Sequence, residues 1–180
     1  MQILFTILSI LAGIILLILI IALFIKKDYL ITRTVSISAP SSTIFEYIQY
    51  LKNQDNYSKW NLMDPTMKKD YSGTDGTIGF ISAWESPNKN VGKGQQKITN
   101  ILPGKGIELE IQFIKPFPGI AKAELNINKI SDTESKVNWS LQSSMKYPTN
   151  IMLLVMNMDK MIGNDLEIGL SNLKQLMESK

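Results

Sequence analysis

Apolar residues recur every three or four positions through the C-terminal stretch, which is the period of one face of an α-helix. The positions that carry this pattern are Ile151, Val155, Met158, Ile162, Leu166, Gly169, Leu173 and Leu176. Charged side chains such as Lys160, Glu167 and Lys174 occupy the other face. The pattern predicts one long amphipathic helix over residues 149–179. At about 1.5 Å per residue this helix would be on the order of 45 Å long, enough to cross a small sheet.

A second pattern, alternation of apolar and polar residues, predicts strands through the middle of the chain. It is clearest over residues 107–114, 121–130 and 136–142, where nearly every apolar side chain is followed by a charged or polar one. The complete set of predicted strands is 31–38, 68–71, 79–86, 93–102, 107–114, 121–130 and 136–142. A sheet with one wet and one dry face is typically antiparallel, with other elements covering its dry face.

Two short helices are expected between the first strand and the second. Pro40 stands near the first position of one helix, whose apolar face begins with Ile44 and Phe45. A second short helix or turn is expected over residues 53–60, and residues 28–30 are expected to be a linker. The element order is therefore one strand, two short helices, six strands and the long helix, which is typical of an α+β domain.

The N-terminal segment 3–25 contains no charged residue and is rich in Ile and Leu, and about 20 such residues span a bilayer. A cleaved signal peptide would have a charged start, a shorter apolar core and a small-residue cleavage site. No charged side chain precedes the segment, and Ala22-Leu23-Phe24 is not such a cleavage site. The pattern favours an uncleaved transmembrane anchor within residues 1–27, followed by one domain over residues 28–180.

The distribution of charged residues predicts the side of the membrane on which this domain lies and argues against one class of partner. Lys26 and Lys27 directly follow the apolar segment and no basic residue precedes it, so the positive-inside rule predicts a single-pass membrane protein with its domain in the cytoplasm. The two lysines account for most of the formal net charge of +3. The rest of the chain is nearly balanced and has no long basic run, which argues against nucleic acid as a partner.

Composition narrows the chemistry further. The chain contains no cysteine and no histidine. Disulfides, thiol nucleophiles and nucleophile–histidine pairs are therefore excluded, and a zinc site is not expected. The sequence predicts no metal site and no cofactor.

The order of these elements, together with a set of short motifs, resembles the START-like (helix-grip) superfamily. More narrowly it is similar to membrane-anchored polyketide cyclase/dehydrase-type (SRPBCC) proteins. The matching stretches are Ile37-Ser38-Ala39-Pro40 with Ile44-Phe45, Trp60, Tyr71-Ser72-Gly73-Thr74-Asp75-Gly76-Thr77-Ile78-Gly79, Val91-Gly92-Lys93-Gly94-Gln95-Gln96-Lys97-Ile98, Pro116-Phe117, Val137-Asn138-Trp139, and Met158-Asp159-Lys160-Met161-Ile162-Gly163 leading into Gly169-Leu170. The resemblance implies a START/Bet v 1-like α+β fold, in which a curved antiparallel sheet wraps around the long C-terminal helix. It also implies an apolar cavity between the two, whose ligand a fold alone does not assign.

Large apolar side chains near the expected grip are the cavity candidates, with one carboxylate among them. They are Phe80, Trp84, Phe113, Phe117, Trp139, Tyr147, Met158, Met161, Ile162 and Asp165. For any single apolar residue the alternative is ordinary core packing. Met158 and Ile162 are expected near the middle of the long helix, facing Trp139 across the dry side of the sheet.

Asp165 falls within the apolar stripe of the predicted helix, and a buried carboxylate is costly unless it is paired. It would either orient a ligand or make a structural hydrogen bond. Three functions follow. The first is a membrane-tethered, non-enzymatic module that binds a hydrophobic small molecule or lipid. The second is a cyclase, dehydratase or hydrolase that uses Asp165, Glu85 or Tyr147. The third is an interaction protein with a vestigial cavity.

Overall fold

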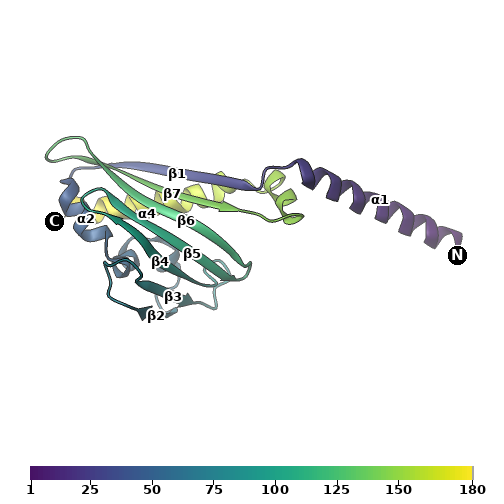
Figure 1. Cartoon of the computed structure of the whole chain (residues 1–180), viewed down its shortest axis with the longest axis horizontal. Coiled ribbons are helices and arrows are strands. Elements are labelled where there is room, and N and C mark those ends of the chain that lie inside the picture. The colour runs from purple at the N-terminus through teal and green to yellow at the C-terminus, as the bar shows by residue number, and fades with distance from the viewer. Residues whose placement is uncertain (180) are drawn as a thin grey trace.

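A computed structural model describes residues 1–179 as a seven-stranded sheet packed on a long helix, with a separate N-terminal helix projecting from one end (Figure 1). The strands are β1 (Asp28–Ile37), β2 (Lys68–Ser72), β3 (Ile81–Glu85), β4 (Lys93–Leu102), β5 (Gly106–Lys115), β6 (Gly119–Lys129) and β7 (Ser135–Ser144). The α-helices are α1 (Gln2–Phe24), α2 (Ser41–Ile48), α3 (Lys59–Met63) and α4 (Met158–Glu178). Two 3₁₀ helices are η1 (Leu51–Asn56) and η2 (Thr149–Leu154). The predicted α+β architecture and antiparallel sheet are confirmed.

The strands follow the order β1-β7-β6-β5-β4-β3-β2, and every neighbouring pair is antiparallel. One row of paired residues crosses the sheet from Tyr29 through Ser143, Ala121 and Ile111 to Gln96. This register brings the start of β1, which follows α1, to the same end of the sheet as the β5–β6 turn. We call this the α1 end of the sheet, and its connections are residues 86–92, 116–118 and 145–157 (Figure 1).

Helix α4 packs along β1, at one side of the sheet. Leu166, Leu170 and Leu173 on this helix are fully buried, and burying a leucine contributes roughly 2 kcal/mol of transfer free energy. Gly169 lies against the indole of Trp139, where a Cβ atom would come within 2.7 Å of the ring. The absence of a side chain at this position therefore lets the helix approach β7 closely.

A charged side chain stands on the dry face of β1 and pairs with α4. The guanidinium of Arg33 donates to Asp159 at 2.9 Å and to Glu167 at 2.6 Å. It passes over Gly163, where a Cβ atom would lie 2.0 Å from its Nη2 atom. The Arg33 hydrogen bond lowers the pKa of the Asp159 carboxyl. Because Asp159 and Glu167 lie about two helical turns apart, the pairing fixes how α4 is rotated and placed along β1.

The long helix begins at Met158, nine residues later than the sequence pattern predicts. The Asn157 side chain accepts a hydrogen bond from the Lys160 backbone N–H at 2.8 Å and caps the helix there. Residues 149–154 instead form η2, which packs beside α1. The helical periodicity continued through this break because a 3₁₀ turn and an α-helix space apolar residues almost alike. Likewise, residues 28–30 belong to β1 and are not a linker.

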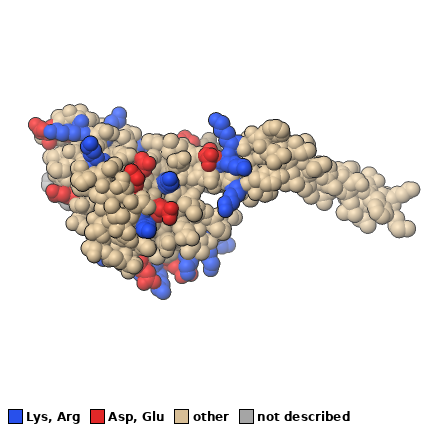
Figure 2. Space-filling model, viewed as in Figure 1, with Lys and Arg blue, Asp and Glu red and all other residues tan. Residues whose placement is uncertain are grey.

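Helix α1 is mostly apolar and contains no charged residue, and it is long and apolar enough to cross a membrane by length and composition. Only Ala22 on this helix is buried, and it packs near η2. The fully buried Asn150 side chain donates from Nδ2 to the carbonyl oxygens of Ala22 at 2.7 Å and Ile25 at 3.1 Å. These bonds satisfy carbonyl groups that a helix end leaves without partners. Figure 2 shows basic side chains at this neck between the domain and the helix.

Candidate functional site

A cavity of about 260 Å³ lies on the dry face of the sheet, under the segment from η1 to α3. Its apolar lining comprises Trp60, Met67, Trp84, Val91, Leu109, Ile111, Phe113, Pro116, Phe117, Ala123, Trp139 and Leu141. Its polar lining comprises Gln54, Ser58, Asn61, Lys69, Ser82, Asn90, Gln96 and Lys115. Among the described residues, none from α4 lines it. The cavity therefore lies between the sheet and the η1–α3 segment. The sequence instead predicts a cavity between the sheet and the C-terminal helix.

Trp84 on β3 forms much of one wall. It is paired with Gly94 on β4, where a Cβ atom would lie 2.6 Å from the indole, so glycine leaves room for the ring. The indole N–H donates to the Val91 carbonyl at 3.2 Å, which ties the wall to the β3–β4 loop. Phe113 meets Trp84 edge-on, with ring centroids 6.5 Å apart, a favourable aromatic geometry. The wall is thus held by a strand pair, a loop and a ring contact.

The other two tryptophans close the opposite side. Trp60 on α3 meets Trp139 on β7 edge-on, with centroids 6.1 Å apart. Buried Tyr57 packs on the same indole at 5.9 Å. All three tryptophans of the chain therefore line this one cavity.

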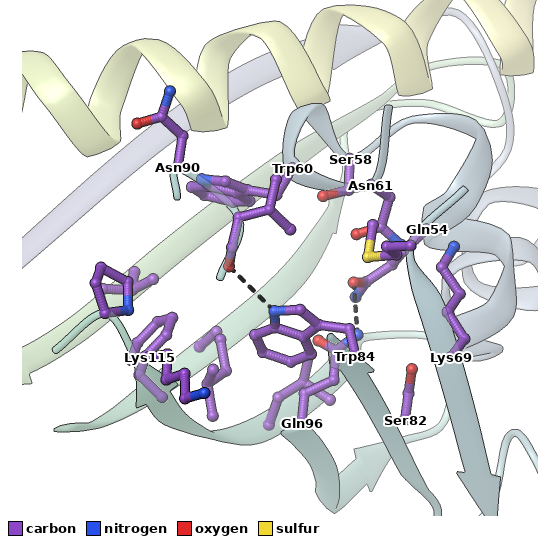
Figure 3. A pocket seen from close by; sticks show the side chains of 18 of the residues that line it. Gln54, Ser58, Trp60, Asn61, Lys69, Ser82, Trp84, Asn90, Gln96 and Lys115 are labelled. Carbon is purple, nitrogen blue, oxygen red and sulfur yellow. Dashed lines mark hydrogen bonds between the residues drawn. The ribbon is translucent and has the colours of Figure 1, made fainter. Parts of the chain in front are cut away.

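Polar side chains gather at one end of the cavity, as Figure 3 shows. Gln96 on β4 donates through Nε2 to Oε1 of Gln54 on η1 at 2.9 Å, and both amides are buried. The Gln54 Nε2 group makes no hydrogen bond of normal geometry with a described residue, and neither does the buried hydroxyl of Tyr57, the polar group with which Gln54 interacts. A buried donor without such a bond costs stability, which a water or ligand acceptor would restore. Nearby, the Lys69 ammonium is paired with Asp55 at 2.6 Å.

The opening of the cavity lies at the α1 end of the sheet. Among its lining residues, the exposed ones are Asn90 on the β3–β4 loop and Lys115, Pro116 and Phe117 on and beside the β5–β6 turn. Phe117 is 81% exposed although it is a large apolar residue. Its ring therefore stands at the rim, with one side toward the cavity and the other toward the surroundings.

The structure brings four of the ten candidate residues to the cavity and places six elsewhere. Trp84, Phe113, Phe117 and Trp139 line the wall. Phe80 is buried and stacks on Tyr71, while Tyr147 and Met161 are exposed. Ile162 is half-buried against the core, and Met158 lines a shallow groove beside the end of α1. Helix α4 starts only at Met158, so Met158 and Ile162 lie in its first turns. The residue of α4 that lies opposite Trp139 is Gly169.

The three groups expected to serve as acid or base do not meet in the cavity. Asp165 is ion-paired with Lys59 of α3, a structural contact between two helices. Glu85 pairs with Lys93 at 2.8 Å on neighbouring strands. Tyr147 lies in the connection between β7 and η2. The geometry therefore supports the structural interpretation of Asp165 and assembles no acid–base pair from these residues.

Sequence reasoning did not assign the polar end of the cavity. A signal was present in two strands, where a polar residue interrupts the dry-face alternation. Gln96 stands between Gly94 and Ile98 on β4, and Ser82 precedes Trp84 by two residues on β3. A polar side chain in such a position either finds a partner or marks a site. Lys69 and Trp60 carried no comparable pattern.

Comparison with known proteins identifies the fold. The chain has the helix-grip (Bet v 1-like, SRPBCC) fold. Norcoclaurine synthase from Thalictrum flavum, solved in complex with dopamine and hydroxybenzaldehyde, is similar with a TM-score of 0.63 and 11% identity, over 84% of this chain and 87% of that one. Ginseng major latex-like protein 151 from Panax ginseng has a TM-score of 0.57 and 11% identity, over 84% and 99%. The Aha1 dimer from Colwellia psychrerythraea has a TM-score of 0.55 and 14% identity, over 83% and 96%.

At these identities the likeness shows the fold alone. No protein family model and no curated protein sequence matches the chain. The activity must therefore be argued from the cavity itself.

Proposed function

We propose that this protein is a membrane-tethered module that binds a hydrophobic small molecule or a lipid chain in the cavity under η1 and α3. The observation that carries the proposal is the lining, in which three tryptophans and two phenylalanines surround a space with one polar end. Mostly apolar pockets with a few convergent polar groups are typical ligand sites. Norcoclaurine synthase, which shares the fold, has been solved with two small aromatic molecules.

The dimensions restrict the ligand. At about 260 Å³ the cavity lies just below the roughly 300–1,000 Å³ of typical small-molecule pockets. A compact ring compound or part of one acyl chain fits this space better than a whole phospholipid. The Gln54–Gln96 end favours a ligand with a hydrogen-bond acceptor, because an amide N–H there makes no hydrogen bond of normal geometry with a described residue.

We propose a non-enzymatic role for the site. Among the described residues that line the cavity there is no carboxylate, and the one ammonium near its polar end, on Lys69, is paired with Asp55. The arrangement suits recognition of an acceptor group more than proton transfer.

Binding in the cavity is tested by tryptophan fluorescence, because all three tryptophans report on this site and none lies in α1. The full-length protein in lipid nanodiscs would be titrated with a brominated medium-chain fatty acid, whose bromine quenches an indole on contact. We expect saturable quenching that a non-brominated analogue reverses. Quenching that only rises linearly with the probe concentration would refute the proposed site.

We propose that α1 is a retained anchor and that the domain is cytoplasmic. The Asn150 side chain is buried against the end of α1 and donates hydrogen bonds to it. Cleavage of α1 would expose this side chain and remove its hydrogen-bond partners. Lys26 and Lys27 then lie on the cytoplasmic side by the positive-inside rule. A reporter that functions only in the cytoplasm should be active when it is fused to the C-terminus. Activity of a reporter that functions only outside the cytoplasm would contradict this orientation.

A further inference from the structure

We infer that the domain makes a second contact with the bilayer, through an apolar patch at the α1 end of the sheet, and that the cavity opens toward the membrane. This inference rests on the proposed role of α1 as an anchor. The patch consists of Met152, Leu154 and Val155 on and after η2, and we call it the η2 patch.

The η2 patch exposes large apolar side chains side by side. Leu154 is 66% exposed and Val155 is 84% exposed, and no described residue covers them. Contiguous exposed apolar surface marks a site where something else binds. In contrast, the apolar residues of α4 that follow are mostly turned into the core.

The position of the patch identifies the bilayer as its occupant. Asn150, within η2, is hydrogen-bonded to the carbonyl groups of Ala22 and Ile25 at the end of α1. The patch is thereby held level with the last turn of a helix that spans the apolar core. Lys26 and Lys27 follow at the same level, where lysines reach lipid headgroups (Figure 2). A surface fixed at this depth meets the membrane interface before it meets any other partner.

A second element reaches the same plane. The β5–β6 turn lies at the α1 end of the sheet, and its tip carries the exposed Phe117 (Figure 1). Exposed phenylalanine and leucine side chains are typical of surfaces that insert into the membrane interface. Because Phe117 also lines the cavity, a domain seated on the η2 patch would turn the cavity opening toward lipid. The ligand would then pass between membrane and cavity without crossing water, which suits a membrane-dissolved molecule.

The test uses depth-sensitive labels, which the chain permits because it contains no cysteine. Single variants Val155→Cys and Phe117→Cys of the full-length protein would carry a small environment-sensitive fluorophore in nanodiscs that contain nitroxide-labelled lipids. The matched control is Ile130→Cys, which is 53% exposed but lies in the β6–β7 turn at the far end of the sheet. We expect nitroxide lipids to quench the first two labels several-fold more than the control. Aqueous iodide should show the reverse order.

Two further measurements separate the possible failures. Asn150→Leu removes the bonds to α1 and should reduce lipid quenching at the Val155→Cys label while the protein stays in the membrane. If the protein resists alkaline extraction but both labels behave as the control does, the second contact is refuted and the anchor stands. A label shielded from both quenchers would mean that a protein partner or second copy covers the patch, which also overturns the inference. Loss of the protein on alkaline extraction would refute the anchor itself, and tryptophan quenching would test the cavity independently.

Discussion

Replacing Gly92 with alanine is expected to destabilise the domain by about 3 kcal/mol and to weaken binding in the cavity. Gly92 has a φ of +66°, and a Cβ atom there would lie 2.1 Å from the Lys115 carbonyl oxygen. The β3–β4 loop therefore meets the β5–β6 turn backbone to backbone at the cavity opening. Alanine would force the two apart, and the Val91 carbonyl that holds the Trp84 indole would move with the loop.

The measurement is a pair of thermal melts with a tryptophan-quenching titration. A loss of this size corresponds to a decrease in melting temperature of roughly 10 °C for a chain of this length. The control is Gly104→Ala, because Gly104 has a similar φ of +70° but nothing within 4 Å of its Cβ position. Gly104→Ala should lower the free energy of unfolding only by the backbone strain, about 1 kcal/mol, and leave the tryptophan quenching unchanged. Equal effects of both variants would show that the loop contact does not shape the cavity.

The sheet was predictable because a strand with one solvent-exposed face has a polar residue at every second position and an apolar residue between them. Over residues 107–113 of β5 and 121–127 of β6 the apolar positions are buried or half-buried, while most of the intervening polar ones are exposed. The dry face of β1 shows the limit of this rule. Arg33 occupies a position that the pattern would assign to an apolar residue, and its two carboxylate partners are more than a hundred residues away. Sequence spacing alone carries no information about such a pairing.

The cavity was less predictable because it is a gap left by the packing of several elements. Helix α4 is held against β1 by Arg33 and against β7 by the absence of a side chain at Gly169. The rest of the dry face is left to the shorter η1–α3 segment, which does not fill it. The sequence pattern placed aromatic residues of the sheet and residues of α4 beside one open space, whereas the cavity of the structure is lined by residues of the sheet and of the η1–α3 segment and by none from α4 among the described residues. The start of α4 depended on one capping side chain, Asn157.

The second large effect is expected for Ser82→Phe, which should weaken probe binding at least tenfold while the domain remains folded. Ser82 is half-buried and lines the polar end of the cavity, so an aromatic ring there would occupy much of the space. In a solid core such a change overpacks and costs about 1–3 kcal/mol. If the space is open, the ring enters it and the loss of stability should stay near or below about 1 kcal/mol. The three tryptophans remain in place, so the quenching assay still applies.

Ala83→Phe is the matched control, because successive side chains on a strand point to opposite faces and Ala83 does not line the cavity. It should leave the quenching titration unchanged, whereas Ser82→Phe should weaken it at least tenfold, a difference of about 1.4 kcal/mol in binding free energy. Binding unaffected by Ser82→Phe would mean that the probe quenches the tryptophans from outside the cavity. Unfolding of Ser82→Phe, combined with no saturable quenching in the unmodified protein, would instead mean that the space is closed in solution. The interaction-protein interpretation would then replace the binding module, because a closed space leaves the exposed surfaces as the only sites of function.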